Sequence, residues 1–240
     1  MEKQATNNTA STSSQRVHNL IILDESGSMM SIWKEAMTGV NETLGTIRAA
    51  KEKYPEQEHL VTLIAFDTPR YDKIFMSTPI DMTHDITEDE YLPRGMTPLY
   101  DAMGRALNEL KHNVKEGDIV LVTVITDGYE NASREYTGPA IKKLIEELKK
   151  QDWVFTYIGA NQDVEKAAGE IAINNHMAFT ADNAGTRVMF DREMNARNNF
   201  FKKVHHNSMD ISHEDKMDIA DGYFSESDDF SDSTNSKKKF

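Results

Sequence analysis

Short apolar runs alternate with longer amphipathic segments along the chain. The apolar runs predict buried strands, because their side chains leave no polar face for solvent. These runs cover residues 17–23, 60–66, 119–125 and 153–158, and a shorter candidate strand lies at 177–179. Strands that alternate with helices of ten or more residues are typical of crossover connections and a mainly parallel sheet.

Apolar residues three and four positions apart predict the helices. The clearest such stripe consists of Ile141, Leu144, Ile145 and Leu148. Similar stripes predict helices within residues 31–53, 99–110, 164–172 and 186–204, the last from a weak pattern.

A turn signal at residues 67–70 precedes a predicted strand at 71–76, so this strand and the one at 60–66 should form an antiparallel hairpin. Residues 77–96 predict a long irregular connection. The fold class is therefore α/β, with a doubly wound, Rossmann-like, mainly parallel sheet, one antiparallel edge strand and helices on both faces. In such sheets, ligands bind beyond the carboxyl ends of the strands.

Composition limits the function classes. The chain has 240 residues, of which 38% are hydrophobic, and a formal net charge of −13. This charge disfavours nucleic acid and anionic membrane as partners and suits cations and basic protein surfaces. The absence of cysteine excludes disulfides and thiolate metal sites. No apolar stretch resembles a signal peptide or a membrane span, so we expect a soluble, cytoplasmic protein.

The chain divides into three parts. Residues 1–16 are polar and predict a flexible arm, and residues 17–204 predict the folded domain. Residues 205–240 contain nine acidic and four basic residues, a net charge of about −5, and predict a disordered acidic tail.

Oxygen-bearing side chains follow the predicted strands. Asp24, Ser26 and Ser28 come after the first strand, Asp127 follows the strand at 119–125, and Thr97 lies between them before a helix. These two carboxylates and three hydroxyls are the hard donors that Mg²⁺ prefers, and they would leave a coordination position open. Each part also has a simpler interpretation: Thr97 and the serines as caps or loop residues, and Asp127 as part of a turn. The spacing alone leaves both interpretations open.

Three further residues are candidates to support the ligands or to border the site. Glu25 either faces solvent or adds negative charge to the site. Asp101 is either an ordinary helix residue or a hydrogen-bond acceptor behind the ligands. Asn161 follows the strand at 153–158 and is either a rim residue or a polar loop residue.

The ordered set Asp24-x-Ser26-x-Ser28, Thr97 and Asp127 resembles the metal-ion-dependent adhesion site (MIDAS) of the von Willebrand factor type A (vWA) domain. The resemblance covers residues 16–204. It implies a six-stranded sheet and a bound Mg²⁺ or Mn²⁺. It also implies that the two serines bind the ion directly, that the two aspartates act through water, and that Thr97 changes between direct and indirect contact.

The resemblance implies that the ion's open position accepts an Asp or Glu carboxylate from a partner protein. We therefore expect a cytoplasmic, metal-dependent adaptor, with an assembly built around an AAA+ ATPase as one possible client. The acidic tail either keeps the protein soluble or occupies the metal site until a partner displaces it.

The alternative function is a magnesium-dependent hydrolase or phosphotransferase. Against it, the segment Asp24-x-Ser26 lacks the second aspartate of an aspartate-nucleophile phosphatase. The chain also lacks the glycine-rich motifs that bind nucleotide phosphates. A metal-free structural module is the third interpretation.

Overall fold

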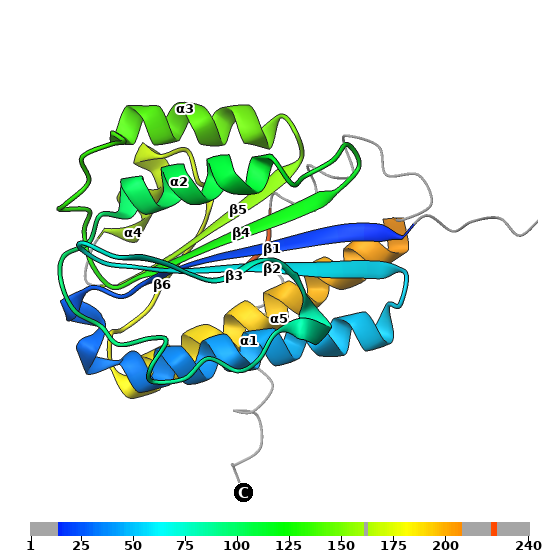
Figure 1. The fold of residues 1–240 in the computed structure, drawn as a ribbon, viewed down its shortest axis with the longest axis horizontal. Coiled ribbons are helices and arrows are strands. Elements are labelled where there is room, and N and C mark those ends of the chain that lie inside the picture. The colour runs from blue at the N-terminus through cyan, green and yellow to red at the C-terminus, as the bar shows by residue number, and fades with distance from the viewer. Residues whose placement is uncertain (1–13, 161–162, 208–221, 225–240) are drawn as a thin grey trace, which may run out of the picture.

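The computed structural model describes residues 14–160, 163–207 and 222–224. These residues contain a six-stranded sheet with the strand order β3-β2-β1-β4-β5-β6 (Figure 1). The strands are β1 (Gln15–Asp24), β2 (Gln57–Phe66), β3 (Tyr71–Pro79), β4 (Ile119–Thr126), β5 (Trp153–Gly159) and β6 (Asn175–Ala178). The predicted strand runs are all present, including the short edge strand.

Five of the six strands are parallel. β1 pairs with β2 and β4, β4 pairs with β5, and β5 pairs with β6, each in parallel register. β3 lies antiparallel to β2, as the turn signal predicted. The predicted fold class is therefore confirmed. The strand order reverses between β1 and β4, which is where doubly wound sheets place their ligands.

Helices cover both faces of the sheet (Figure 1). The α-helices are α1 (Trp33–Lys53), α2 (Leu99–Lys111), α3 (Gly138–Lys149), α4 (Val164–Glu170) and α5 (Asn183–Asn207). α1 and α5 pack on one face, and α2, α3 and α4 pack on the other. Two short 3₁₀ helices, η1 (Gly27–Ser31) and η2 (Ile80–Met82), lie within connections. Because helices cover both faces, almost every residue of the central strands β1, β4 and β5 is buried.

The described chain ends with residues 222–224, which pack against the domain. Tyr223 is buried, and its hydroxyl donates a hydrogen bond of 3.1 Å to the Glu193 carboxylate on α5. The rest of the predicted tail beyond α5, and the predicted arm before residue 14, lie outside the described residues. Within the described ranges, no helix has the length and apolar character needed to cross a bilayer.

Candidate functional site

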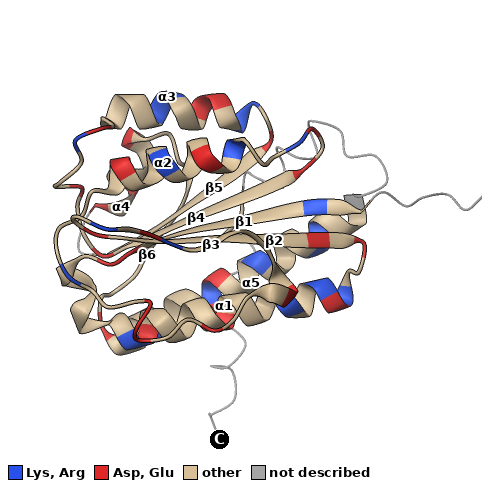
Figure 2. Cartoon of the chain, in the orientation of Figure 1, with Lys and Arg blue, Asp and Glu red and all other residues tan. Residues whose placement is uncertain are grey.

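The predicted metal ligands meet at the carboxyl edge of the sheet. Asp24 ends β1 and Asp127 follows β4, so the two strands at the point of reversal deliver the two carboxylates side by side. Figure 2 shows charged residues on the loops at this end, whereas the middle of each strand is almost free of charge. The topology therefore brings together residues that lie about 100 positions apart in the sequence.

Asp24 is completely buried and held in place by hydrogen bonds. One of its carboxylate oxygens accepts the Ser26 backbone N–H at 2.7 Å, and the other accepts the Thr126 hydroxyl at 2.6 Å. The Tyr91 hydroxyl donates to the Asp24 backbone carbonyl at 2.9 Å. Sequence reasoning did not identify Thr126 or Tyr91. Thr126 directly precedes Asp127 and so lay within reach of the same pattern, whereas nothing near Tyr91 in the sequence indicates this contact.

The two serines and Asp127 form a chain of oxygens. The Ser26 and Ser28 hydroxyl oxygens are 3.1 Å apart, and Ser28 donates to the Asp127 carboxylate at 2.5 Å. Adjacent ligands of an octahedral Mg²⁺ lie about 3 Å apart, because each bond to the ion is about 2.1 Å long. The spacing of the serine oxygens therefore suits neighbouring positions on one ion.

The hydroxyls do not cap helices. Ser26 stands at the start of η1 without a side-chain capping bond, and α2 begins after Pro98, also without one. Thr97 is held through its backbone instead, since its N–H donates to the Asn131 side chain and its carbonyl accepts the Asn131 N–H. The capping interpretation of these residues is therefore wrong.

Gly128 leaves space between the converging hydroxyls. A Cβ at this glycine would lie 3.4 Å from the Ser28 Oγ and 3.6 Å from the Thr97 Oγ1. Both hydroxyls therefore lie near one point in front of Gly128, and a side chain at position 128 would occupy that point.

The site carries negative charge that the described residues do not compensate. Burial raises the pKa of Asp24 to about 6, while hydrogen bonds from Thr126 and Ser26 act in the opposite direction. Burial also raises the pKa of Asp127. Within the described ranges, neither carboxylate forms an ion pair with a basic side chain. Two desolvated carboxylates without a cation fit a site for a hard divalent ion.

Hydroxyls distinguish this donor set from an acidic metal cluster. Among the described residues, no group of three or more His, Cys, Asp or Glu side chains is placed to hold a metal. Any ion here would depend on Ser26, Ser28 and Thr97 in addition to the two aspartates. Such an ion keeps much of its positive charge, because three of its five donors are neutral.

Glu25 is fully buried, so the interpretation that it faces solvent is wrong. Its carboxylate accepts the Leu92 N–H at 2.7 Å and lies 3.1 Å from the Arg70 guanidinium. Burial raises the pKa of Glu25, and the hydrogen bond and the Arg70 charge oppose this shift. Glu25 thus joins the loop after β1 to the segment that precedes Thr97.

Asp101 anchors the loop that follows Asp127. Its carboxylate accepts the backbone N–H groups of Arg134, Glu135 and Tyr136, each at 2.8 Å. Burial acts to raise the pKa of Asp101, but these three bonds lower it overall. Asp101 therefore positions the loop, and within the described ranges its carboxylate makes no hydrogen bond to the five predicted ligands. The third candidate rim residue, Asn161, lies outside the described residues.

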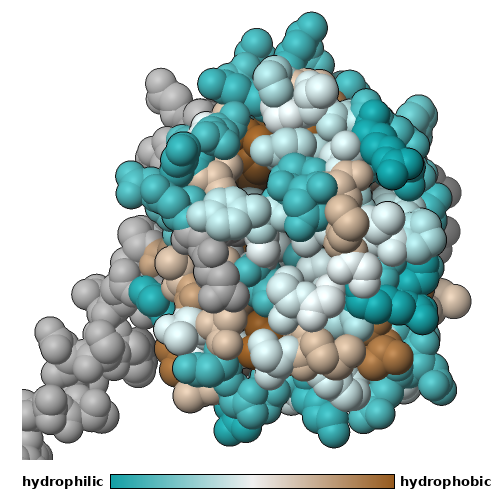
Figure 3. Space-filling model, turned by 90° about the vertical axis from the view of Figure 1, so that its left-hand side faces the viewer, coloured by the Kyte–Doolittle hydropathy of each residue, from teal (hydrophilic) through white to brown (hydrophobic). Residues whose placement is uncertain are grey.

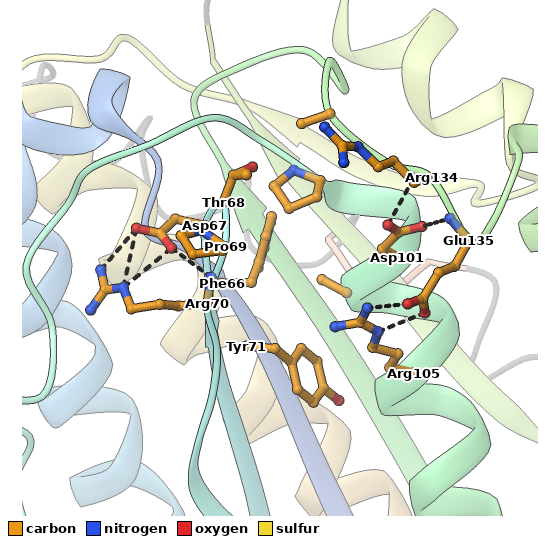
Figure 4. Close-up of a pocket in the computed structure, with 13 residues that line it drawn as sticks. Phe66, Asp67, Thr68, Pro69, Arg70, Tyr71, Asp101, Arg105, Arg134 and Glu135 are labelled. Atoms are coloured by element: carbon orange, nitrogen blue, oxygen red, sulfur yellow. Dashed lines mark hydrogen bonds and ion pairs between the residues drawn. The ribbon is translucent and has the colours of Figure 1, made fainter.

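A small pocket borders the site between the β2–β3 turn and α2 (Figure 4). Its volume is about 170 Å³. Most of its charges are paired internally: Arg70 with Asp67 at 2.9 Å, Arg105 with Glu135, and Asp101 with the backbone of the facing loop. We infer that these contacts stiffen the rim of the site.

Exposed apolar side chains flank the predicted ligands in the sequence. Met30, Met96 and Tyr129 are about half exposed, and each lies within two residues of Ser28, Thr97 or Asp127. Figure 3 views this end of the molecule and shows apolar residues distributed among polar ones. Methionine and aromatic side chains are enriched in protein interfaces relative to the rest of the surface.

Comparison with known proteins gives one family match. The family model of the von Willebrand factor type A domain matches residues 20–192. No curated protein matches the chain.

Three solved structures share the fold at low sequence identity. The pilus adhesin SpaC from Lactobacillus rhamnosus GG has a TM-score of 0.58 and 15% identity, with 78% of this chain and 31% of the adhesin covered. The PilB minor pilin from Streptococcus sanguinis, in a mutant form, has a TM-score of 0.53 and 11% identity, with 80% of this chain and 63% of the pilin covered. The SpRpn10 VWA domain has a TM-score of 0.51 and 11% identity, with 73% of this chain and 94% of that domain covered. This chain thus spans less than two thirds of the pilin and about a third of the adhesin.

Proposed function

Because the chain belongs to the von Willebrand factor type A domain family, we propose that it is a metal-dependent protein-binding module. Domains of this family are generally protein-interaction modules and not enzymes. The metal dependence and the nature of the partner are the parts that we add.

Five residues would hold the ion, which we propose is Mg²⁺ or Mn²⁺. Ser26, Ser28 and Thr97 offer hydroxyls, and Asp24 and Asp127 offer carboxylates. When bound, the ion would supply an electrophilic position for an incoming carboxylate oxygen. The chain's own contribution is to keep these oxygens together: Thr126 orients Asp24, Asn131 holds Thr97, and Asp101 fixes the loop after Asp127.

The proposed partner presents an Asp or Glu side chain. A carboxylate is a hard donor that suits Mg²⁺, and its bond to the ion would be buried beneath the apolar rim of Met30, Met96 and Tyr129. We also propose that the protein acts in the cytoplasm as an adaptor in a multiprotein assembly, such as one built around an AAA+ ATPase. The family resemblance supports this part of the proposal.

The observation that carries the proposal is the contact of Ser28 with Asp127 beside the open point at Gly128. Isothermal titration with MgCl₂ tests ion binding directly. Wild type should bind one Mg²⁺, and Asp127→Ala should bind none while its circular dichroism stays unchanged. Glu116→Ala, which removes a carboxylate at the opposite edge of the sheet, is the matched control and should bind like wild type.

Affinity capture from the native cell tests the partner. Proteins retained in Mg²⁺ should be lost in EDTA and lost with Asp127→Ala. Equal capture under all three conditions would contradict the proposal.

The hydrolase alternative gains little from the structure. The Ser28 hydroxyl does contact a carboxylate, but within the described ranges no histidine or lysine side chain hydrogen-bonds to Ser26 or Ser28. An activated serine needs such a base, and the family generally lacks catalytic activity.

A further inference from the structure

A second cavity opens beside the predicted metal site, between α2, α4 and the loop after β4. Its volume is about 410 Å³. Tyr129 and Glu130 line it from the loop, and Leu99 and Tyr100 line it from α2. Tyr129 is two residues beyond Asp127, and Leu99 is two residues beyond Thr97. The same two segments that supply predicted ligands therefore continue into the wall of this cavity, which places it within reach of a peptide whose carboxylate occupies the metal site.

Negative charge dominates the cavity. Its lining holds three carboxylates, from Glu130, Asp163 and Glu170, and one ammonium group, from Lys166. Within the described part of the chain, none of these carboxylates is in an ion pair. Burial raises the pKa of Tyr100, and the charges of Glu130 and Glu170 raise it further, so both carboxylates act on the same phenol.

The carboxylate of Glu130 is rigidly placed. It accepts hydrogen bonds from the N–H groups of Tyr100, Ala132 and Ser133 and from the Ser133 hydroxyl, at distances of 2.7 to 2.9 Å. Asp163 accepts the Lys166 N–H at the start of α4. Two of the three negative groups, Glu130 and Asp163, are thus held in place before any ligand arrives, which lowers the cost of binding a cation.

Three aromatic rings line the cavity together with the apolar side chains of Leu99, Ala167 and Ile171. Tyr100, Tyr129 and Tyr157 all border the cavity, and Tyr129 is 57% exposed. The face of a tyrosine ring attracts a cation, and its apolar body packs against the methylene groups of a long side chain. Rings and carboxylates together suit a lysine or arginine side chain better than an apolar or acidic one.

We propose that this tyrosine-lined cavity binds a Lys or Arg side chain of the same partner whose carboxylate occupies the metal site. The inference rests on the proposed function in one respect, because the metal site determines where the peptide lies. The preference for a basic side chain follows from the cavity lining alone. It defines the partner as a segment with an acidic residue and a basic residue a few positions apart. The net charge of −13 favours such a segment over a purely acidic one.

Two substitutions in the cavity should act in opposite directions. Glu170→Gln removes an attractive charge from an exposed helix position, so it should weaken binding of a basic side chain about fivefold. Lys166→Gln removes the repulsive charge on the same helix and should strengthen binding about twofold. Glu116→Gln changes the net charge as Glu170→Gln does, but at the opposite edge of the sheet, and should leave binding unchanged.

The probe is a random heptapeptide library displayed on phage and selected on the full chain in MgCl₂. Selected peptides should carry Lys or Arg within four residues of an Asp or Glu. Synthetic versions of these peptides should bind Lys166→Gln more tightly than wild type, Glu116→Gln as tightly as wild type, and Glu170→Gln less tightly. Selection without basic residues, or equal effects of Glu170→Gln and Glu116→Gln, would overturn the inference.

A second probe separates this inference from the metal proposal. N-acetyl-arginine methylamide, titrated in an NMR experiment, should shift the amide signals of Tyr129 and Lys166 in both wild type and Asp127→Ala. Shifts that are retained in Asp127→Ala support binding of a basic side chain in the cavity, independently of ion binding at the metal site. An absence of shifts in wild type overturns the inference. Peptide binding that survives EDTA contradicts the proposed function alone.

Discussion

The Ser28 hydroxyl lies 2.5 Å from the Asp127 carboxylate, although 99 positions separate the two residues in the sequence. The contact exists because β1 and β4 are parallel neighbours that end at the same edge of the sheet. It extends the row of serine oxygens from Ser26 through Ser28 to Asp127, beside the space in front of Gly128. The relationship between Ser28 and Asp127 is therefore the structural basis of the expected ion binding.

The first prediction concerns the effect of Mg²⁺ on stability. An ion that binds only the folded chain should raise the free energy of unfolding, by about 2.7 kcal/mol at a concentration about 100 times its Kd. The physical reason is that the ion neutralises Asp24 and Asp127, which are buried without a cation. Urea denaturation with and without MgCl₂ measures the effect.

KCl at the same ionic strength is the control for this experiment, since it screens charges without fitting the site. Asp127→Ala should show no difference between MgCl₂ and KCl. Equal stabilisation of wild type by both salts would show that screening alone is responsible.

The second prediction concerns Thr126, which orients Asp24 through a hydrogen bond of 2.6 Å. Thr126→Val keeps the shape of the side chain but removes the donor. Partners of this kind typically account for about 10- to 100-fold in metal affinity, so Mg²⁺ binding measured by calorimetry should weaken within this range. Thr156→Val, which removes an equally buried hydroxyl on β5 away from the site, should leave the affinity unchanged.

The third prediction tests the space in front of Gly128. Gly128→Ala should fold normally, because the new Cβ makes only ordinary contacts and the residue is not in the left-handed region. The methyl group would nevertheless lie between the Ser28 and Thr97 hydroxyls. Mg²⁺ demands near-octahedral geometry, so we expect its affinity to fall at least about tenfold.

Gly45→Ala on α1 is the matched control, since a Cβ there meets no atom within 4 Å. It should leave Mg²⁺ binding at the wild-type level. If Gly128→Ala binds Mg²⁺ as well as Gly45→Ala does, the ion does not use the space between these hydroxyls.

Much of the fold could be predicted because the strands are short apolar runs and the ligand-type residues follow them directly. Asp24, Ser26, Ser28 and Asp127 could be placed at one edge from their positions, because parallel strands deliver their carboxyl ends there. Their positions alone did not decide whether they bind an ion, and Thr97 precedes a helix, so the resemblance to the vWA family was needed to group all five. Glu25 could not be placed in this way. Its partner Arg70 lies 45 positions away, on the turn between β2 and β3, and no local pattern indicates that this turn folds back over the loop.

The weak apolar stripe of α5 also has a physical explanation. The inner face of this helix carries the ion pair of Glu193 and Arg197, both fully buried. Arg197 donates to the Asn19 side chain on β1 and to the Thr123 hydroxyl on β4. A buried polar network interrupts the hydrophobic pattern, so the sequence alone predicts the helix only weakly although it packs closely on the sheet.

The last prediction concerns pH and His59 on β2, which lies beside this network. Burial, together with the positive charges of Arg197 and Lys51, lowers the pKa of His59 to about 4, while the charge of Glu56 acts in the opposite direction. In the unfolded chain the pKa is about 6.5. As the pH falls below 6.5, the unfolded chain therefore takes up a proton that the folded chain does not, and stability decreases down to about pH 4. The loss between pH 7 and pH 5 should be roughly 1–2 kcal/mol from this residue.

Urea denaturation at pH 7 and pH 5 measures this loss, and the test is the difference in pH dependence between wild type and His59→Gln. The variant should lose less stability on acidification, because it removes the proton that only the unfolded chain binds. Comparing slopes also removes the contribution of Asp24, whose raised pKa acts in the opposite direction and is common to both proteins. His112→Gln, at an exposed position after α2, is the matched control and should keep the wild-type slope. If His59→Gln keeps the wild-type pH dependence of stability, His59 takes up its proton equally in the folded and unfolded chains. The polar network under α5 would then not prevent protonation of His59.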